Sequence, residues 1–302
     1  MLADADLPKG GSGDGAWHDL RMPPSDPRRP AVVAHRGASE AEAEHTLAAY
    51  KRAIADGADA LECDVRLTRD GVLVCVHDRR VDRTSSGRGV LSTLELGDLE
   101  ALDFGPSPSE DPQSTVDWEA PDHDRSRVLT LERLLETVLD CGRPLELAIE
   151  TKHPTRYAGL VELELVELLG RFGLAAGRAD RPPLARVMSF APSSLRRIHA
   201  MAPDIRTVLL FRRVPLRYRD GALPPRFRIA GPSLEVLRAY PDWVGRLQAR
   251  GHEVHVWTVN ESEDVAFVVE LGVDAIITDR PGPVLAQLSD QQRATGGASQ
   301  GQ

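Results

Sequence analysis

Residues 59–66 read Asp-Ala-Leu-Glu-Cys-Asp-Val-Arg and have the pattern of a β-strand with two different faces. Side chains alternate along a strand, so Glu62 and Asp64 would point to one side, and Leu61, Cys63 and Val65 to the other. The apolar side fits packing against a helix. The acidic side has no such partner, so this segment predicts a covered strand that presents two carboxylates to a polar site.

Further runs of strand length recur along the chain, and amphipathic helical stretches separate most of them. The eight runs are Ala31–Ala34, Asp59–Arg66, Leu145–Thr151, Arg186–Phe190, Arg206–Phe211, Phe227–Ala230, Glu253–Val259 and Asp274–Thr278. The helical stretches include Leu47–Ala55, Leu131–Leu139, Leu160–Leu169, Leu234–Ala249 and Val265–Leu271. Eight successive βα units predict an α/β protein with a closed TIM (β/α)8 barrel. The Pro- and Arg-rich segment 212–226 predicts a sixth helix that is very short or missing.

A ninth run, Val72–Val76, follows the second strand after only Thr-Arg-Asp-Gly. This connection is too short for a parallel crossover, so we expect the run to fold back as a hairpin. The long stretch from about 79 to 127 then precedes the next helix. Because ordinary loops in compact domains are much shorter, it predicts a small insertion after the second strand, above the carboxyl ends of the barrel strands.

The two ends of the chain differ in composition from the middle. Residues 1–29 contain Gly-Gly-Ser-Gly-Asp-Gly and a Pro/Arg-rich run, and residues 289–302 are rich in Ser, Gln and Gly. We expect both ends to be disordered, with the barrel at 30–288. The three cysteines, Cys63, Cys75 and Cys141, fit neither a disulfide framework nor a zinc cluster, so we expect reduced thiols.

Charge and hydropathy exclude several classes of partner. Lys and Arg total 37 against 46 Asp and Glu, a net charge of −9, which argues against nucleic acid and anionic membranes as partners. No stretch approaches the roughly 18 apolar residues of a membrane span, and the N-terminus lacks a signal-peptide pattern. We therefore expect a cytoplasmic protein that acts on a small molecule; its oligomeric state is not readable from the sequence.

Polar residues gather where the predicted strands end, which in a TIM barrel is where catalytic groups stand. They come from the first strand, the second strand, the hairpin and the third strand. They are His35, Arg36, Glu62, Asp64, His77, Glu150 and Lys152. Near the seventh strand, Trp257 is a candidate lining residue of the substrate pocket.

The acids predict a metal site. Glu62, Asp64 and Glu150 would converge at the barrel mouth, and burying unpaired carboxylates is costly unless a cation compensates them. Oxygen ligands alone favour Ca²⁺ or Mg²⁺ over zinc. The alternative is a salt-bridge network in which Lys152 and Arg36 neutralise the acids.

The remaining groups suit phosphate chemistry. His35 and His77 could serve as an acid and base pair, because one imidazole can accept a proton while the other donates one. Arg36 and Lys152 could bind a phosphate anion and stabilise charge in the transition state.

These residues resemble the ordered signature of the glycerophosphodiester phosphodiesterase family. The matching segments are 35–39 (His-Arg-Gly-Ala-Ser), 44–50 (Glu-His-Thr-Leu-Ala-Ala-Tyr), 62–65 (Glu-Cys-Asp-Val), 76–78 (Val-His-Asp), 149–152 (Ile-Glu-Thr-Lys), 189–190 (Ser-Phe), 257–260 (Trp-Thr-Val-Asn) and 277–279 (Ile-Thr-Asp). The resemblance implies a barrel with an insertion after the second strand, and the same metal, acid-base and phosphate roles for the residues above. It also implies hydrolysis of glycerophosphodiesters to glycerol-3-phosphate and an alcohol.

Three questions stay open at this point. The nucleophile could be water, or the glycerol 2-hydroxyl through a cyclic phosphate, and the alcohol is unspecified. Family members usually carry Pro-Glu-Asn-Thr where residues 43–46 read Ala-Glu-His-Thr, so the roles of Glu44 and His45 are undetermined. The alternatives to this hydrolase are a phospholipase D-like lyase that acts on intact lipids, and a non-catalytic phosphate-binding barrel.

Overall fold

The computed structural model describes residues 29–105, 123–157, 159–176 and 184–298, with side chains described up to residue 294. Of the N-terminal segment expected to be disordered, residues 1–28 lie outside this part. Arg29, by contrast, pairs with Asp59 at 2.7 Å. Among the helices described, none is both long enough and apolar enough to cross a membrane.

The predicted closed barrel is confirmed. Its eight parallel strands are β1 (Ala31–His35), β2 (Ala60–Leu67), β4 (Glu146–Thr151), β5 (Ala185–Ser189), β6 (Arg206–Phe211), β7 (Ile229–Pro232), β8 (Glu253–Val256) and β9 (Ala275–Thr278). Each strand pairs with the next around the ring, and β1 pairs with both β9 and β2, which closes it. The ninth strand, β3 (Leu73–Cys75), pairs antiparallel with β2, as the short connection predicts.

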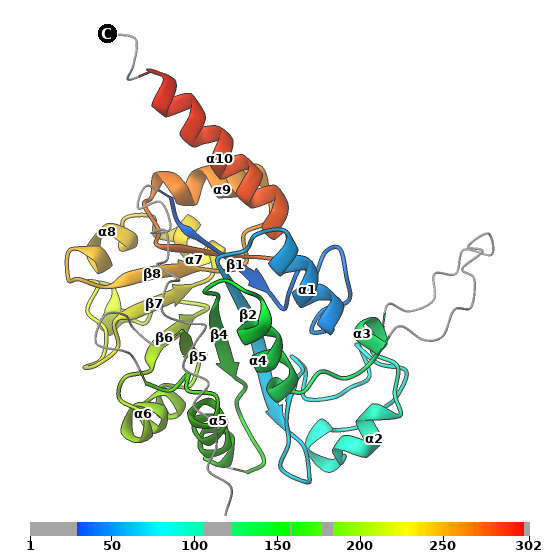
Figure 1. Cartoon of the computed structure of the whole chain (residues 1–302). Helices are drawn as coiled ribbons and strands as arrows, with labels where there is room; N and C mark the ends of the chain where they lie inside the picture. Colours follow the sequence, from blue (N-terminus) through cyan, green and yellow to red (C-terminus); the bar gives the residue numbers. More distant parts are fainter. Residues whose placement is uncertain (1–28, 106–122, 158, 177–183, 299–302) are drawn as a thin grey trace, which may run out of the picture.

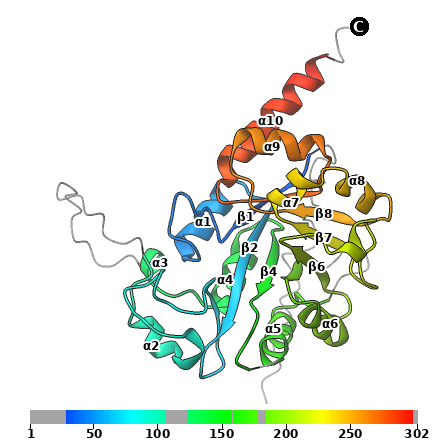
Figure 2. The ribbon, with the colours of Figure 1, turned by 180° about the vertical axis from the view of Figure 1, so that it is seen from behind.

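Helices surround the ring of strands (Figures 1 and 2). They are α1 (Leu47–Ala55), α4 (Leu131–Asp140), α5 (Leu160–Arg171), α6 (Pro192–Met201), α7 (Leu234–Ala239), α8 (Trp243–Gln248), α9 (Ser262–Glu270) and α10 (Pro281–Ala298). After β6 only a three-residue 3-10 turn, η2 (Leu216–Tyr218), is present, in keeping with the expected short or missing sixth helix.

Two expectations about helices are wrong. The stretch 234–249 is two helices rather than one, because Pro241 lacks the N–H that a continuous helix needs and disfavours helical geometry at Tyr240. The polar tail expected to be disordered from residue 289 continues α10 as far as Ala298. Its Gln and Arg residues favour a helix, and Arg293 pairs with Asp290 one turn before it.

The barrel separates two apolar regions. The inner one fills the ring and consists of Val33, Ala60, Ala148, Met188, Val208, Leu210, Ile229, Ala275 and Ile277. The outer one lies between strands and helices and includes Leu61, Cys63 and Val65. The alternation predicted for residues 59–66 is therefore observed, and it directs Glu62 and Asp64 into the barrel. All three cysteines are free thiols.

The segment after the hairpin forms a small unit beside the end of β2 (Figure 1). Its described part contains η1 (Leu91–Thr93), α2 (Leu96–Glu100) and α3 (His123–Ser126). An apolar cluster of its own joins it to the hairpin, through Val74, Val76, Val81, Leu91, Leu99, Phe104 and Val128. Residues 106–122 of the expected insertion lie outside the described part.

Candidate active site

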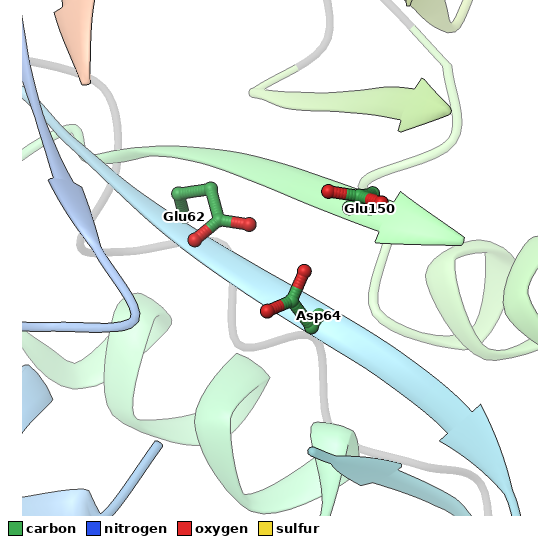
Figure 3. Close-up of side chains that lie close together, drawn as sticks. All are labelled: Glu62, Asp64 and Glu150. Carbon is green, nitrogen blue, oxygen red and sulfur yellow. The ribbon is translucent and has the colours of Figure 1, made fainter. Parts of the chain in front are cut away.

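Strand register brings the predicted residues together. His35 at the end of β1 is aligned with Glu62 on β2, and Asp64 on β2 is aligned with Glu150 on β4. Because these pairs are neighbours in a parallel sheet, their side chains meet at the carboxyl ends of the strands. Figure 3 shows the three carboxylates converging from the two adjacent strands.

The three carboxylates form a compact buried group. Glu62, Asp64 and Glu150 are 1%, 0% and 7% exposed, and each contributes one oxygen to a set whose members lie within 4.8 Å of one another. Three acids at this spacing repel one another unless positive charge lies between them.

Two cations supply part of that charge. Lys152 Nζ lies 2.8 Å from Asp64 Oδ1 and 2.8 Å from Glu150 Oε1, and Arg36 Nε lies 3.2 Å from Asp64 Oδ2. Glu62 accepts a hydrogen bond from the backbone N–H of Arg36 at 3.0 Å. Asp64 and Glu150 therefore form the salt bridges that the alternative predicted. Among the described contacts, no Lys or Arg side chain forms a salt bridge with Glu62.

The pKa values show that this compensation is incomplete. For Asp64, burial raises the pKa, but Lys152, His45 and Arg36 outweigh it and hold the pKa well below its usual value. Burial and then the charge of Asp64 raise the pKa of Glu62 well above its usual value. The same two causes raise the pKa of Glu150 to about 7, despite Lys152. With all three acids ionised, the group would carry more negative charge than its two cations neutralise, and the raised pKa values of Glu62 and Glu150 express this cost. A divalent cation on these oxygens would compensate the third charge.

His35 is oriented by the far end of the chain. Its Nδ1 lies 2.6 Å from Asp279 Oδ1, and Asp279 also accepts hydrogen bonds from Ser39 Oγ at 2.9 Å and Asn260 Nδ2 at 2.7 Å. Burial raises the pKa of Asp279, but these hydrogen bonds, with that of His35 the largest, lower it to about 2. A carboxylate that stays ionised at neutral pH therefore accepts a hydrogen bond from His35 Nδ1–H and fixes the orientation of the ring.

His77 has a carboxylate partner of its own. Its Nδ1 lies 2.7 Å from Asp78 Oδ1, and Arg66 donates two hydrogen bonds to its carbonyl oxygen at 3.0 and 2.8 Å. Burial lowers the pKa of His77, Asp64 raises it, and Lys152 and Arg36 lower it further, to about 4. At neutral pH this ring is uncharged, with Nδ1–H on Asp78 and a lone pair on Nε2.

The groups line one cavity of about 70 Å³ at the barrel mouth. Its polar lining residues include His35, Arg36, Glu62, His77, Glu150 and Lys152. Trp257 also lines this cavity. The centres of the Trp257 and Phe190 rings lie 5.5 Å apart in an edge-on arrangement, and the Arg212 guanidinium lies 5.4 Å from the centre of the Trp257 ring. The Trp257 indole N–H donates to the Gly231 carbonyl at 2.8 Å, which fixes the ring as a cavity wall.

The sequence pattern described as "Glycerophosphoryl diester phosphodiesterase family" matches residues 35–283. The chain belongs to this family.

Named relatives agree with the match. The "Probable glycerophosphodiester phosphodiesterase 1" of Mycobacterium tuberculosis is 47% identical over 86% of this chain and 93% of its own length. The "Glycerophosphodiester phosphodiesterase" of Bacillus subtilis is 31% identical over 84% of this chain and 85% of its own. An Oleispira antarctica phosphodiesterase, solved with the product sn-glycerol-3-phosphate, has a TM-score of 0.70 at 23% identity over 86% of this chain and 97% of its own, and shows the same fold.

The contacts of His45 explain how a histidine fits where family members usually carry asparagine. His45 is buried, and its Nε2 lies 3.0 Å from Asp64 Oδ2 while its Nδ1 lies 2.8 Å from the Tyr50 hydroxyl. Because an ionised carboxylate only accepts, Nε2 carries the hydrogen and donates to Asp64. The backbone of His45 has a φ of 62°, in the left-handed region where both Asn and His are enriched. The substitution thus keeps the turn and a donor.

All seven residues singled out from the sequence lie in this one site, and Trp257 lies in its wall. The sequence included Asp279 in the segment 277–279 of the family signature but gave no indication that it contacts His35. It also gave no role to Asp78 or Arg212. The signal for Asp78 was its position directly after His77; Arg212 carried no signal beyond its place after the sixth strand.

Proposed function

We propose that this family member hydrolyses glycerophosphodiesters to glycerol-3-phosphate and an alcohol, with a divalent cation. The observation that carries the proposal is the pair of imidazoles, each held by a carboxylate, on a cavity that also contains three acids and two cations. The names of the M. tuberculosis and B. subtilis relatives support the same reaction.

Glu62, Asp64 and Glu150 would hold the cation, because their clustered oxygen donors fit Mg²⁺ or Ca²⁺. When bound, the cation neutralises charge on the phosphate oxygens. Arg36 and Lys152 line the same cavity, so their remaining donors can bind those oxygens from the protein side.

The two histidines would divide the proton transfers. His77, neutral with a pKa of about 4, is the group that can accept a proton from the nucleophile. His35, whose ring faces the Asp279 carboxylate, is the group that can carry a proton to the leaving alcohol. The nucleophile is water or the glycerol 2-hydroxyl, and trapping of a cyclic glycerophosphate distinguishes the second route from the first.

The test is the release of glycerol-3-phosphate from a panel of glycerophosphodiesters with choline, ethanolamine, glycerol or inositol as the alcohol. We expect release that requires Mg²⁺ or Ca²⁺, stops with chelator and is lost in His35→Ala. The matched control is His199→Ala, on the outer helix α6, which should keep its activity. Cleavage of phospholipids in vesicles, without cleavage of the panel, would support the lyase alternative.

Metal binding without turnover of either kind of substrate would support the non-catalytic barrel. The cytoplasmic location is part of the same proposal, and cell fractionation tests it.

A further inference from the structure

A second, larger cavity of about 390 Å³ adjoins the catalytic one. Its walls are the end of β2, the inserted residues 90–93 and the loop 152–157 that follows β4. The Tyr157 hydroxyl donates to the Ser92 carbonyl at 2.7 Å, which ties the loop to the insertion. Lys152 lines both cavities, so a molecule bound at Lys152 can extend into either.

The charged side chains that line this cavity are all cationic among the described residues. They are Arg66, Arg79, Arg156 and Lys152, and no Asp or Glu is among the described lining residues. The whole chain carries a net charge of −9, so the cavity has the opposite sign to the rest of the protein. A concave wall of one sign concentrates ligands of the other sign.

The arginines differ in how far protein groups already neutralise them. Arg66 uses its guanidinium on the His77 carbonyl, and its burial lowers its pKa although carboxylates of the active site act on it. In the described part of the chain, Arg79 and Arg156 form no ion pair; Arg156 lies 5.9 Å from the centre of the Tyr157 ring. Two guanidinium groups therefore remain for an anion outside the protein.

We propose that this cavity binds an anionic group, a carboxylate or phosphate, on the alcohol side of the substrate. This inference rests on the proposed function and adds the class of alcohol. With the phosphodiester at Lys152, the glycerol arm would lie in the barrel mouth and the alcohol arm beside Arg79 and Arg156. The volume is within the range of about 300–1,000 Å³ typical of small-molecule sites, so it holds such a head group.

The test compares two substrates that differ by one carboxylate, glycerophosphoserine and glycerophosphoethanolamine. We expect the wild-type protein to have the higher kcat/KM on glycerophosphoserine, with a preference that weakens as salt is raised. Arg156→Gln should lower the ratio of the two kcat/KM values about tenfold, and the Arg79→Gln/Arg156→Gln double variant should lower it further. Arg196→Gln, which removes an exposed arginine from α6, is the matched control and should leave the ratio unchanged.

Two results would overturn the subsite. The first is a ratio that the double variant does not change. The second is a fall in the ratio with Arg212→Gln instead, which would place the anionic group in the barrel mouth.

If neither substrate is cleaved, the proposed reaction fails, and calorimetry still tests the cavity without turnover. The probes are O-phosphoserine and phosphoethanolamine. Tighter binding of O-phosphoserine that is lost in the double variant supports the cavity, and equal binding of the two probes refutes it. Inorganic phosphate that binds as tightly as O-phosphoserine would also refute it, because the site would then recognise phosphate alone.

Discussion

Replacing Glu150 by Gln should make the protein more stable to unfolding when no metal is bound, and should abolish activity when metal is supplied. In the folded protein, burial and the neighbouring Asp64 raise the pKa of Glu150 to about 7, from a usual value near 4.5. Because each factor of ten in proton affinity corresponds to about 1.4 kcal/mol, ionising this group in the fold costs about 3 kcal/mol above pH 7. Gln is neutral and keeps an oxygen that can accept from Lys152, so it avoids this cost.

The sign of the effect fixes its pH dependence. A carboxyl whose pKa is higher in the fold than in the unfolded chain stabilises the fold fully below about pH 4.5, and this contribution is lost as pH rises towards 7. Relative to wild type, Glu150→Gln should therefore gain about 3 kcal/mol at pH 8 but only about 1 kcal/mol at pH 5.5. The assay is urea unfolding at both pH values, with chelator present.

The control is Glu167→Gln on α5, whose side chain is exposed, and it should change the free energy of unfolding little at either pH. Added Mg²⁺ or Ca²⁺ should stabilise wild type but not Glu150→Gln, because the variant lacks one of the three oxygen donors. A variant that in chelator is no more stable than wild type at pH 8 would refute the claim that the carboxylates are under-compensated.

Three further outcomes follow from the contacts around the two histidines and Asp64. His77→Ala should lower kcat by about 10²- to 10⁴-fold, as steady-state kinetics would show. In the wild-type protein, a pH-rate profile should show kcat/KM falling as pH drops through about 4, because protonation of His77 removes the proposed base. Asp279→Asn should lower activity about 10- to 100-fold with little change in KM, because His35 loses the charge that orients it. His45→Ala should lower the free energy of unfolding by about 1–3 kcal/mol, since Asp64 loses a buried donor; chemical denaturation checks it.

The sequence predicted the strands of the candidate site well because the pattern that defines them is local. A period of two in residues 59–66 is enough to direct Glu62 and Asp64 to the same side, and the strand ends identify the mouth of the barrel. The partner of His35 is different in kind. Asp279 contacts His35 because β9 pairs with β1 when the barrel closes. A local sequence pattern does not predict which distant acceptor will bind an imidazole.

The errors in the helices have equally specific causes. The apolar spacing of residues 234–249 continues through the break, so periodicity alone predicts one helix across α7 and α8, although Pro241 interrupts it. At the other end, the polar composition of residues 289–302 is also typical of a disordered tail. A helix that packs on one side near its start and is exposed beyond it has the same composition, and α10 is of this kind.

The insertion contacts the candidate active site and also forms a wall of the neighbouring cavity. Arg83 forms two hydrogen bonds to the carboxylate of Glu44, at 2.8 and 2.7 Å, and one to Asp78 at 2.6 Å. Glu44 in turn accepts from Arg36, and Asp78 holds His77. One inserted arginine thus connects Glu44, which contacts Arg36, with Asp78, which contacts His77. We therefore expect sequence changes in residues 90–93 to alter the larger cavity without disturbing these contacts, and loss of Arg83 to disturb the partners of both Arg36 and His77.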